Sequence, residues 1–203
     1  MIDRYAIEWL RPGLVAAAGV LARAGAKADQ VTLLGFALGA AGSTAIALGR
    51  FGIGLAALAA SRLCDGLDGA LARLTAPTER GGFLDITLDF VFYASVPLAF
   101  AIADPARNAL AAAVLLATFV GTTSSFLAFA ALAAQRGLRS EAFPTKGIYY
   151  LGGLSEATET LVCFALMCLW PAHFAVFAYV YAVPCAITTL TRILAGWHAF
   201  SGR

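Results

Sequence analysis

The sequence predicts an all-α, polytopic membrane protein with six transmembrane helices and an N-terminal amphipathic surface helix, forming one domain over residues 1–203. Hydrophobic residues occupy 61% of the 203 positions and charged residues only 13%, and the mean hydropathy is +0.81. Because a helix needs about 20 apolar residues to cross a bilayer, this supply suffices for six crossings. The composition argues against a disordered chain, a disulfide scaffold or a soluble globular domain.

The N-terminal segment 5–21 is predicted to be an amphipathic helix that lies on the membrane surface. Ile7, Leu10 and Leu14 share one side of such a helix, and Trp9 could sit at the level of the headgroups. Charged residues interrupt this part of the chain too often for a cleaved signal peptide or a transmembrane start.

Six apolar spans follow, separated by links that contain charged residues, glycine or proline. They are predicted at residues 31–48, 51–73, 82–103, 108–134, 147–170 and 172–200. A short polar link joins the second and third spans, and the longest polar loop, 135–146, precedes the fifth. No repeat, low-complexity tract or linker divides the chain into two domains.

The distribution of lysine and arginine predicts the orientation in the membrane. One side holds only Arg50 and Arg107. The other holds Arg4, Arg11, Arg23, Lys27, Arg73, Arg80, Arg136, Arg139, Lys146 and Arg203. This asymmetry places both termini in the cytoplasm, which agrees with an even number of spans.

Small residues recur every four positions in the first span, at Gly35, Gly39 and Ser43. This spacing lets helix backbones approach closely. It is typical of packing within one chain and of a homodimer, and the sequence does not distinguish the two.

The net charge and the cysteine positions argue against a nucleic-acid-binding site and against a redox or zinc site. A net charge of +2 is too small to indicate binding of nucleic acid. The four cysteines all lie in apolar runs without a CxxC pair, which is typical of small buried side chains.

Four aspartates lie inside or beside apolar helices, where they are costly. Asp65 and Asp68 fall near the end of the second span, and Asp85 and Asp89 near the start of the third. Each would cost about 2.5–3.5 kcal/mol at the middle of a membrane helix. Such an arrangement indicates that something compensates the charges.

The spacing of these residues predicts what compensates them. At 100° per residue, Asp65 and Asp68 share a helix stripe with the small residues Gly69 and Ala72, and the other two aspartates are one turn apart. A short link makes the two helices antiparallel neighbours, so both pairs can converge near the cytoplasmic side. Four hard oxygen ligands suit two Mg²⁺ or Mn²⁺ ions.

The residues around the aspartates favour a phosphate ligand. Gly69 and Ala72 leave room beside the helix, and Arg73 can meet a phosphate. Together these features predict a site for a metal-bound pyrophosphate. The alternative is a set of helix-end aspartates that are merely solvated. Arg62, one turn before Asp65, could neutralise a carboxylate.

The pattern from Asp65 to Asp89 resembles the signature of the CDP-alcohol phosphotransferases (CDP-alcohol phosphatidyltransferases), D-x2-D-G-x2-A-R-x7/8-G-x3-D-x3-D. All eight fixed positions are present, at Asp65, Asp68, Gly69, Ala72, Arg73, Gly81, Asp85 and Asp89. Residues 29–35 resemble the family's entry to its first helix, with Asp29 where asparagine is common. Residues 146–160 and the closing Leu-Trp-Pro at 169–171 resemble a bacterial inner-membrane branch, for which the resemblance assigns no substrate.

The resemblance implies an enzyme of phospholipid biosynthesis in the cytoplasmic membrane, with a cytoplasmic active site. It implies transfer of a substituted phosphate, often phosphatidyl, from a CDP-linked donor such as CDP-diacylglycerol to an alcohol, with release of CMP. By position, the four aspartates would bind two metal ions and Asp89 would also be the general base. The residues implied for the CDP moiety are Gly69, Ala72, Arg73 and Thr32.

Other polar residues are candidates for binding the acceptor alcohol. Lys146 opens the fifth span and Arg192 lies near the cytoplasmic end of the sixth, where two cations would suit a phosphorylated alcohol. Glu156 and Glu159 are expected one to two turns into the fifth helix. Positive-inside anchors for the cations, and an internal ion-pair network for the glutamates, stay open as alternatives.

Two other functions remain to be weighed. Intramembrane acids also mark ion pathways, so a small-solute or metal-ion transporter is the main alternative. A transporter is expected to place its acids near the membrane midplane, often on broken helices, whereas these acids cluster toward one side. A non-catalytic scaffold would have no need for Asp89.

Overall fold

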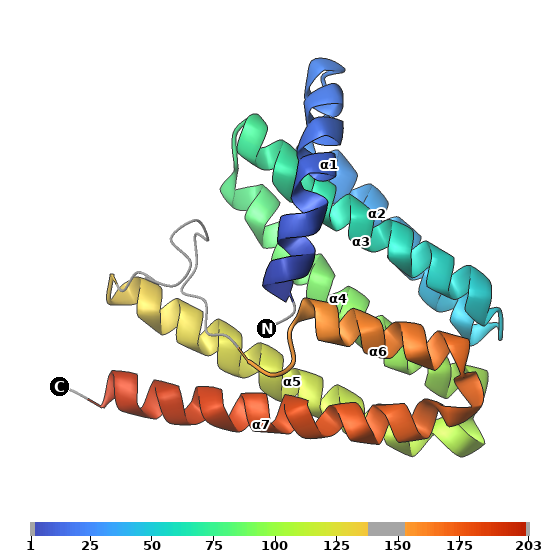
Figure 1. Ribbon diagram of the computed structural model, residues 1–203. Helices are drawn as coiled ribbons and strands as arrows, with labels where there is room; N and C mark the ends of the chain where they lie inside the picture. Colours follow the sequence, from blue (N-terminus) through green and yellow to red (C-terminus); the bar gives the residue numbers. More distant parts are fainter. Residues whose placement is uncertain (1–2, 138–152, 202–203) are drawn as a thin grey trace.

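The computed structural model describes residues 3–137 and 153–201, with side chains from residue 10 onward, and every regular element in this part of the chain is helical. This confirms the all-α prediction. The elements are α1 (Asp3–Arg23), α2 (Ala28–Ala47), α3 (Phe51–Leu74), α4 (Glu79–Ala103), α5 (Pro105–Gln135), α6 (Ala157–Leu169), the 3₁₀ turn η1 (Pro171–His173) and α7 (Phe174–Phe200) (Figure 1).

The links between helices carry the residues that end and begin them. Gly49, with φ of 73°, lets the chain turn sharply after α2. Thr78 caps α4 by accepting a hydrogen bond from the backbone N–H of Gly81 at 3.0 Å. Asp104 caps α5 in the same way from Arg107, at 3.2 Å, and Pro105 occupies the first turn.

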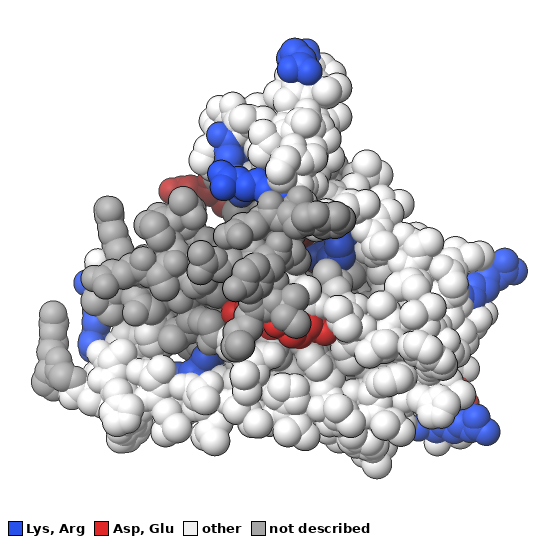
Figure 2. Space-filling view, viewed as in Figure 1, with Lys and Arg blue, Asp and Glu red and all other residues white. Residues whose placement is uncertain are grey.

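The two ends of the helix bundle differ in charge. The turns α2–α3, α4–α5 and α6–α7 gather at one end, and the link α3–α4, the end of α5 and the C-terminus lie toward the other (Figure 1). The first end holds Arg50 and Arg107, and Figure 2 shows a broad uncharged surface between its blue side chains and the charged groups nearer the middle. The structure thus keeps the predicted asymmetry among the described cations.

Four helices are long and apolar enough to cross a membrane: α2, α4, α5 and the continuous unit of η1 and α7. The prediction of six spans is therefore confirmed only in part. Helix α3 has 24 residues, which is sufficient length, but it carries four charged side chains from Arg62 onward. Helix α6 has 13 residues, and at 1.5 Å per residue it reaches about 20 Å of a hydrocarbon core about 30 Å thick.

The predicted start of the fifth span is wrong for the residues that the structure describes. Residues 153–156 are not helical, so Glu156 is the N-cap of α6 and Glu159 lies in its first turn. The backbone N–H groups of Leu154 and Ser155 both donate to Oγ1 of Thr188 on α7, at 3.0 and 3.2 Å. This tertiary contact satisfies groups that a helix would otherwise bond internally.

The small residues of α2 serve packing within the chain. A Cβ on Gly35 would lie 2.9 Å from Cys64 Cβ on α3, and one on Gly39 would lie 2.5 Å from the Phe92 ring on α4. Ser43 and Ser95 share a hydrogen bond of 2.7 Å. Because Gly35, Gly39 and Ser43 are buried between helices of the same chain, this stripe does not offer a surface for a homodimer.

Two apolar clusters hold the bundle together. The larger contains stacked aromatic rings, among them Phe100 and Phe174 with centroids 4.6 Å apart. The smaller fixes α1 onto α3, with Ala18 fully buried against Leu71 and its neighbours and with Leu14 packed against the cluster. The helical N-terminal segment is thus confirmed, and its position on a membrane surface stays a prediction.

Candidate functional site

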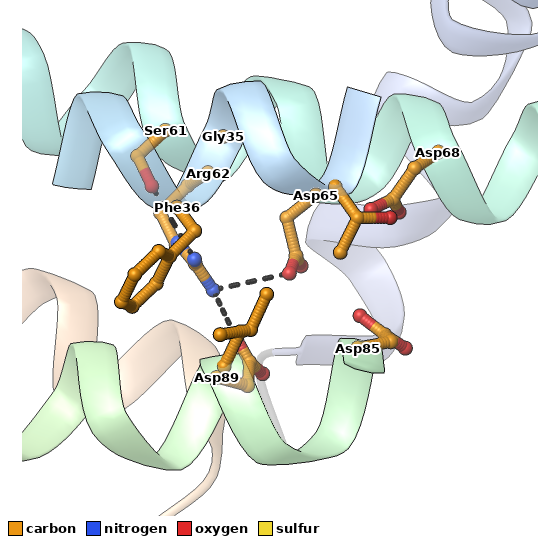
Figure 3. Close-up of a pocket in the computed structure, with 10 residues that line it drawn as sticks. Gly35, Phe36, Ser61, Arg62, Asp65, Asp68, Asp85 and Asp89 are labelled. Carbon is orange, nitrogen blue, oxygen red and sulfur yellow. Dashed lines mark hydrogen bonds and ion pairs between the residues drawn. The ribbon is translucent and has the colours of Figure 1, made fainter. Parts of the chain in front are cut away.

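The four signature aspartates line one pocket between α2, α3 and α4 (Figure 3). Helix spacing places Asp65 and Asp68 on the face of α3 that meets α4, and Asp85 and Asp89 on the facing side of α4. The remaining lining residues are Thr32, Gly35, Phe36, Ser61, Arg62 and Leu88. The structure therefore brings the two pairs of aspartates together in one pocket, as the spacing predicts.

The aspartates differ in their access to water. Asp68 is 4% exposed, and its Oδ2 accepts no hydrogen bond in the described structure. The side chains of Asp65 and Asp89 are about one-third exposed, and Asp85 is open to solvent. A buried carboxylate oxygen without a partner is costly, so Asp68 Oδ2 fits a ligand that the pocket is built to receive.

Arg62 is the cation that the structure places among these acids. Its Nη1 donates to Oδ1 of Asp89 across the α3–α4 interface and lies 3.3 Å from Oδ1 of Asp65. Its guanidinium carbon also stands 3.9 Å from the centre of the Phe92 ring. The prediction that Arg62 neutralises a carboxylate is borne out, but the carboxylate of the direct hydrogen bond is Asp89.

The chemistry of the donor set fits divalent magnesium or manganese, because four carboxylates supply hard oxygen ligands. The remaining space in the pocket is about 10 Å³, on the scale of a water molecule or a small ion. Over residues 3–137 and 153–201, no three acidic, histidine or cysteine side chains already stand as ligands around one point. Arg62 lies between two of the four acids and keeps them from meeting directly.

The residues predicted for the CDP moiety fall into two places. Thr32 lines the acid pocket itself. Gly69 is half-buried, and a Cβ there would lie 3.4 Å from Nη1 of the exposed Arg73, so the guanidinium reaches over the glycine. Ala72 is half-buried on the same stripe of α3, outside the lining of the acid pocket.

A second and larger cavity adjoins the first at Asp89. It has a volume of about 530 Å³ and lies between α4, α5, α6 and α7. Its walls are mainly apolar, and its polar groups are Asp89, Tyr93, Thr122, Thr123, Ser124, Ser155, Glu156, Thr160 and Arg192. We call it the acceptor-side cavity.

Arg192 and Glu156, two of the predicted acceptor residues, line this cavity. Arg192 is 8% exposed, and its Nη1 donates to the carbonyl oxygen of Thr122 at 3.0 Å. Glu159 is in the first turn of α6 but is not among the lining residues of the described cavity. Lys146 lies outside the described residues.

The hydroxyl groups that α5 contributes to the acceptor-side cavity were not among the predicted acceptor residues. Thr122, Thr123 and Ser124 belong to a run of four consecutive hydroxyl residues in an otherwise apolar helix. That polar run was a signal in the sequence. Tyr93, one turn after Asp89, carried no comparable signal.

Comparison with known proteins bears on both pockets. The family model described as "CDP-alcohol phosphatidyltransferase" matches residues 26–190, which include the whole lining of the acid pocket and that of the acceptor-side cavity except Arg192. The chain belongs to the CDP-alcohol phosphatidyltransferase family. It is also 48% identical over 197 residues to the inner membrane protein YnjF of Escherichia coli K12, covering 97% of this chain and 96% of that protein.

Solved structures of this family resemble the chain over most of its length. Mycobacterium tuberculosis phosphatidylinositol phosphate synthase (PgsA1) with CDP-DAG bound superposes with a TM-score of 0.71 at 26% identity, covering 91% of this chain and 93% of that one. The same synthase in complex with manganese and citrate gives 0.70 at 26% identity, over 91% and 88% of the two chains. The family fold therefore covers about nine-tenths of the chain.

Proposed function

We propose that this chain transfers a phosphatidyl group from CDP-diacylglycerol to an alcohol and releases CMP, as a step of phospholipid biosynthesis. The observation that carries the proposal is the position of Asp89. It lines the acid pocket together with the other three signature aspartates, and it also lines the acceptor-side cavity. A group at that junction can act on an alcohol held on one side and a phosphate held on the other.

Asp65, Asp68, Asp85 and Asp89 would hold two divalent ions. When bound, Mg²⁺ or Mn²⁺ would withdraw charge from the donor pyrophosphate and stabilise CMP as it leaves. The manganese complex of the related synthase supports this assignment, as does the partnerless Oδ2 of Asp68. Thr32, Gly69, Ala72 and Arg73 would bind the CDP moiety, and the CDP-DAG complex of the relative supports a CDP-linked donor.

Asp89 would be the general base. It takes the proton from the acceptor hydroxyl while the hydroxyl oxygen forms a bond to the phosphatidyl phosphorus. The bond from that phosphorus to the oxygen of CMP breaks, and its electron pair leaves with CMP. The Asp89 side chain also lines the acceptor-side cavity, where it can reach an alcohol held there.

The acceptor-side cavity would bind the alcohol. Its hydroxyl groups on α5 can bond to a polyol, and Arg192 can meet a negative substituent. Lys146, Glu156 and Glu159 remain acceptor residues of the proposal. The relatives include a phosphatidylinositol phosphate synthase and, over 63 residues at 52% identity, an archaetidylinositol phosphate synthase of Methanothermobacter thermautotrophicus, so inositol phosphate is the first alcohol to test. Glycerol phosphate is the second.

Substitution of Arg192 tests the acceptor site separately from the donor site. We expect R192Q to raise KM for the acceptor at least tenfold while KM for CDP-diacylglycerol stays within about twofold, since one charge-assisted contact is worth about 1.5–3 kcal/mol. R192K, which keeps the charge, is the matched variant and should lie between R192Q and the native protein. An equal rise in both KM values would remove Arg192 from acceptor recognition.

We propose a bacterial inner-membrane location with both termini and the active site in the cytoplasm. The inner-membrane relative and the four long apolar helices support the location. The charge difference between the two bundle ends supports the orientation, and α1 would lie at the cytoplasmic surface. Reporter fusions after Arg203 and within the α4–α5 link should report opposite sides of the membrane.

The decisive experiment measures CMP release by the purified protein with CDP-diacylglycerol, Mg²⁺ or Mn²⁺, and a panel of alcohols. Release that needs one alcohol and stops with a chelator would support the proposal. Loading the protein into vesicles and following flux of metal ions tests the transporter alternative. Flux without CMP release would overturn the transferase, although α3 and α4 run unbroken through all four acids, unlike typical transporter sites.

A further inference from the structure

Among the described residues that line the acid pocket, Arg62 alone has a charge opposite to that of the aspartates, and it lies outside the eight signature positions. Its side chain is 13% exposed. It joins the first and the last signature acids, Asp65 on α3 and Asp89 on α4, from a single nitrogen (Figure 3). A residue so placed acts on the two acids that the reaction needs.

The contacts of Arg62 give its guanidinium a second support besides the carboxylates. The group stacks on Phe92 at 3.9 Å, with Tyr93 at 5.7 Å, and Nη2 lies 3.4 Å from Oγ of the buried Ser61. Cation–π contact and a hydroxyl can hold an arginine whose carboxylate partners are taken. The Arg62 side chain can therefore keep its contacts with Phe92 and Ser61 when Asp65 and Asp89 bind another ligand.

The charges in the pocket decide which partner Asp65 and Asp89 keep. Four carboxylates carry four negative charges, of which Arg62 offsets one. Two divalent ions would offset all four, and each would repel the guanidinium at Asp89 Oδ1. Arg62 and a metal ion thus compete for the same oxygens.

We propose that Arg62 is a resident counter-cation of the acid pocket, displaced toward Phe92 and Ser61 when a divalent ion binds Asp65 and Asp89. The inference rests on the proposed function, since it takes these acids as metal ligands. It makes Arg62 a positioning residue: it keeps α3 and α4 together through their acids, and it yields Asp89 to the metal and the acceptor. In the opposite role, Arg62 would hold the acids in the geometry that a metal ion needs, and its loss would weaken the binding of the metal.

Binding of Mn²⁺ alone, without either substrate, separates the two roles. The full-length protein in nanodiscs is titrated with Mn²⁺, and the free ion is followed by electron paramagnetic resonance. We expect R62Q to bind Mn²⁺ about tenfold more tightly than the native protein, a common size for coupling between competing ligands. R62K, which keeps a charge but loses the planar fork, should lie between them.

R80Q is the matched control. Arg80 is also paired to an aspartate, Asp29, at the same end of the bundle, but it is 76% exposed and outside the pocket. The affinity of the R80Q protein for Mn²⁺ should stay within twofold of the native value. Size-exclusion and thermal unfolding check that each variant is folded, and R62K alone decides the matter if R62Q does not fold.

The outcomes distinguish this inference from the proposed function. Native affinity in R62Q, or weaker binding, would overturn the counter-cation role while leaving the metal site intact. Binding by R62Q but not by the native protein would support it in its strongest form. If neither protein binds Mn²⁺, both the inference and the metal-dependent transferase fail. Tighter binding by R62Q without CMP release for any alcohol would overturn the transferase alone.

Discussion

The acid pocket and the acceptor-side cavity meet at Asp89, but they are built in different ways. The pocket takes its four acids from residues 65–89, on two unbroken helices joined by a four-residue link. The cavity takes its polar groups from residues 89–192, on four helices and one irregular segment. Helix period places each pair of acids on one face of its helix, and the short link brings the two helices together, whereas contacts between residues far apart in the sequence assemble the second set.

Because of this difference, the acid pocket and the acceptor-side cavity are expected to be sensitive to different substitutions. The geometry of the acid pocket depends on how closely α2, α3 and α4 approach one another, and glycines set that distance. The geometry of the cavity depends on single hydrogen bonds, such as those from Leu154 and Ser155 to Thr188. Substitutions can therefore be chosen to damage one region and spare the other.

Asp89 belongs to both regions, so its substitution should have the largest effect. We expect D89N to lower the rate of CMP release by about 10²–10⁴-fold, the usual contribution of a general base, because an amide cannot accept the proton. Multiple-turnover assays at saturating donor and acceptor would measure the loss. Since asparagine keeps the size of the side chain, thermal unfolding should change little, although the Arg62 contact weakens. Near-native turnover would remove Asp89 from the role of base.

Substitution of Thr188 alters the acceptor-side cavity and leaves the four aspartates of the acid pocket unchanged. Its side chain is fully buried, and its Oγ1 accepts from two backbone N–H groups and lies 3.2 Å from the Ser155 hydroxyl. We expect T188V to cost about 1–3 kcal/mol of unfolding free energy, because it leaves buried donors without an acceptor. KM for the acceptor should also rise several-fold, while affinity for Mn²⁺ stays unchanged.

The matched variant T188S keeps the hydroxyl oxygen and should behave like the native protein. Unfolding in detergent, steady-state kinetics and Mn²⁺ titration measure the three quantities. If T188V weakened Mn²⁺ binding as much as acceptor binding, the two regions would be coupled, and the separation drawn between them would be wrong.

The same difference explains what the sequence could predict. Local period and residue spacing are sufficient to predict the order of the helices, the convergence of the four acids and the small-residue stripe of α2. The start of α6 cannot be predicted in this way, because Gly153 approaches α7 so closely that a Cβ would lie 2.4 Å from Thr188 Cγ2, and that neighbour is 35 positions away. The direct bond of Arg62 to Asp89 was likewise hidden, since spacing along α3 points only to Asp65.

Gly39 tests the close approach that shapes the acid pocket. A Cβ there would meet the ring of Phe92 at 2.5 Å and Oγ of Ser61 at 3.0 Å, and both neighbours are buried. We expect G39A to destabilise the protein by about 1–3 kcal/mol, the range for overpacking a core. Because Phe92 supports Arg62, Mn²⁺ affinity should shift as well.

Gly52 provides the control for helix propensity. It lies in the first turn of α3, and a Cβ there would meet nothing within 4 Å. G52A should therefore be neutral or stabilising by up to about 1 kcal/mol. Equal destabilisation by the two substitutions would mean that the backbone of glycine, and not the close contact, matters at these positions.

The smallest effect is expected at the edge of the acid pocket, where Arg80 on α4 donates to Oδ2 of Asp29 on α2 at 3.0 Å from Nε and 2.5 Å from Nη2. The bidentate geometry is favourable, but Arg80 is 76% exposed, and such pairs contribute about 0–1 kcal/mol. R80Q should thus lower the unfolding free energy by less than about 1 kcal/mol, and added salt should reduce the difference further. Thermal unfolding of both proteins at low and high salt measures it. A larger, salt-independent loss would show that this pair fixes α2 against α4, and the compact frame of the acid pocket would then depend on a long-range contact, as the acceptor-side cavity does.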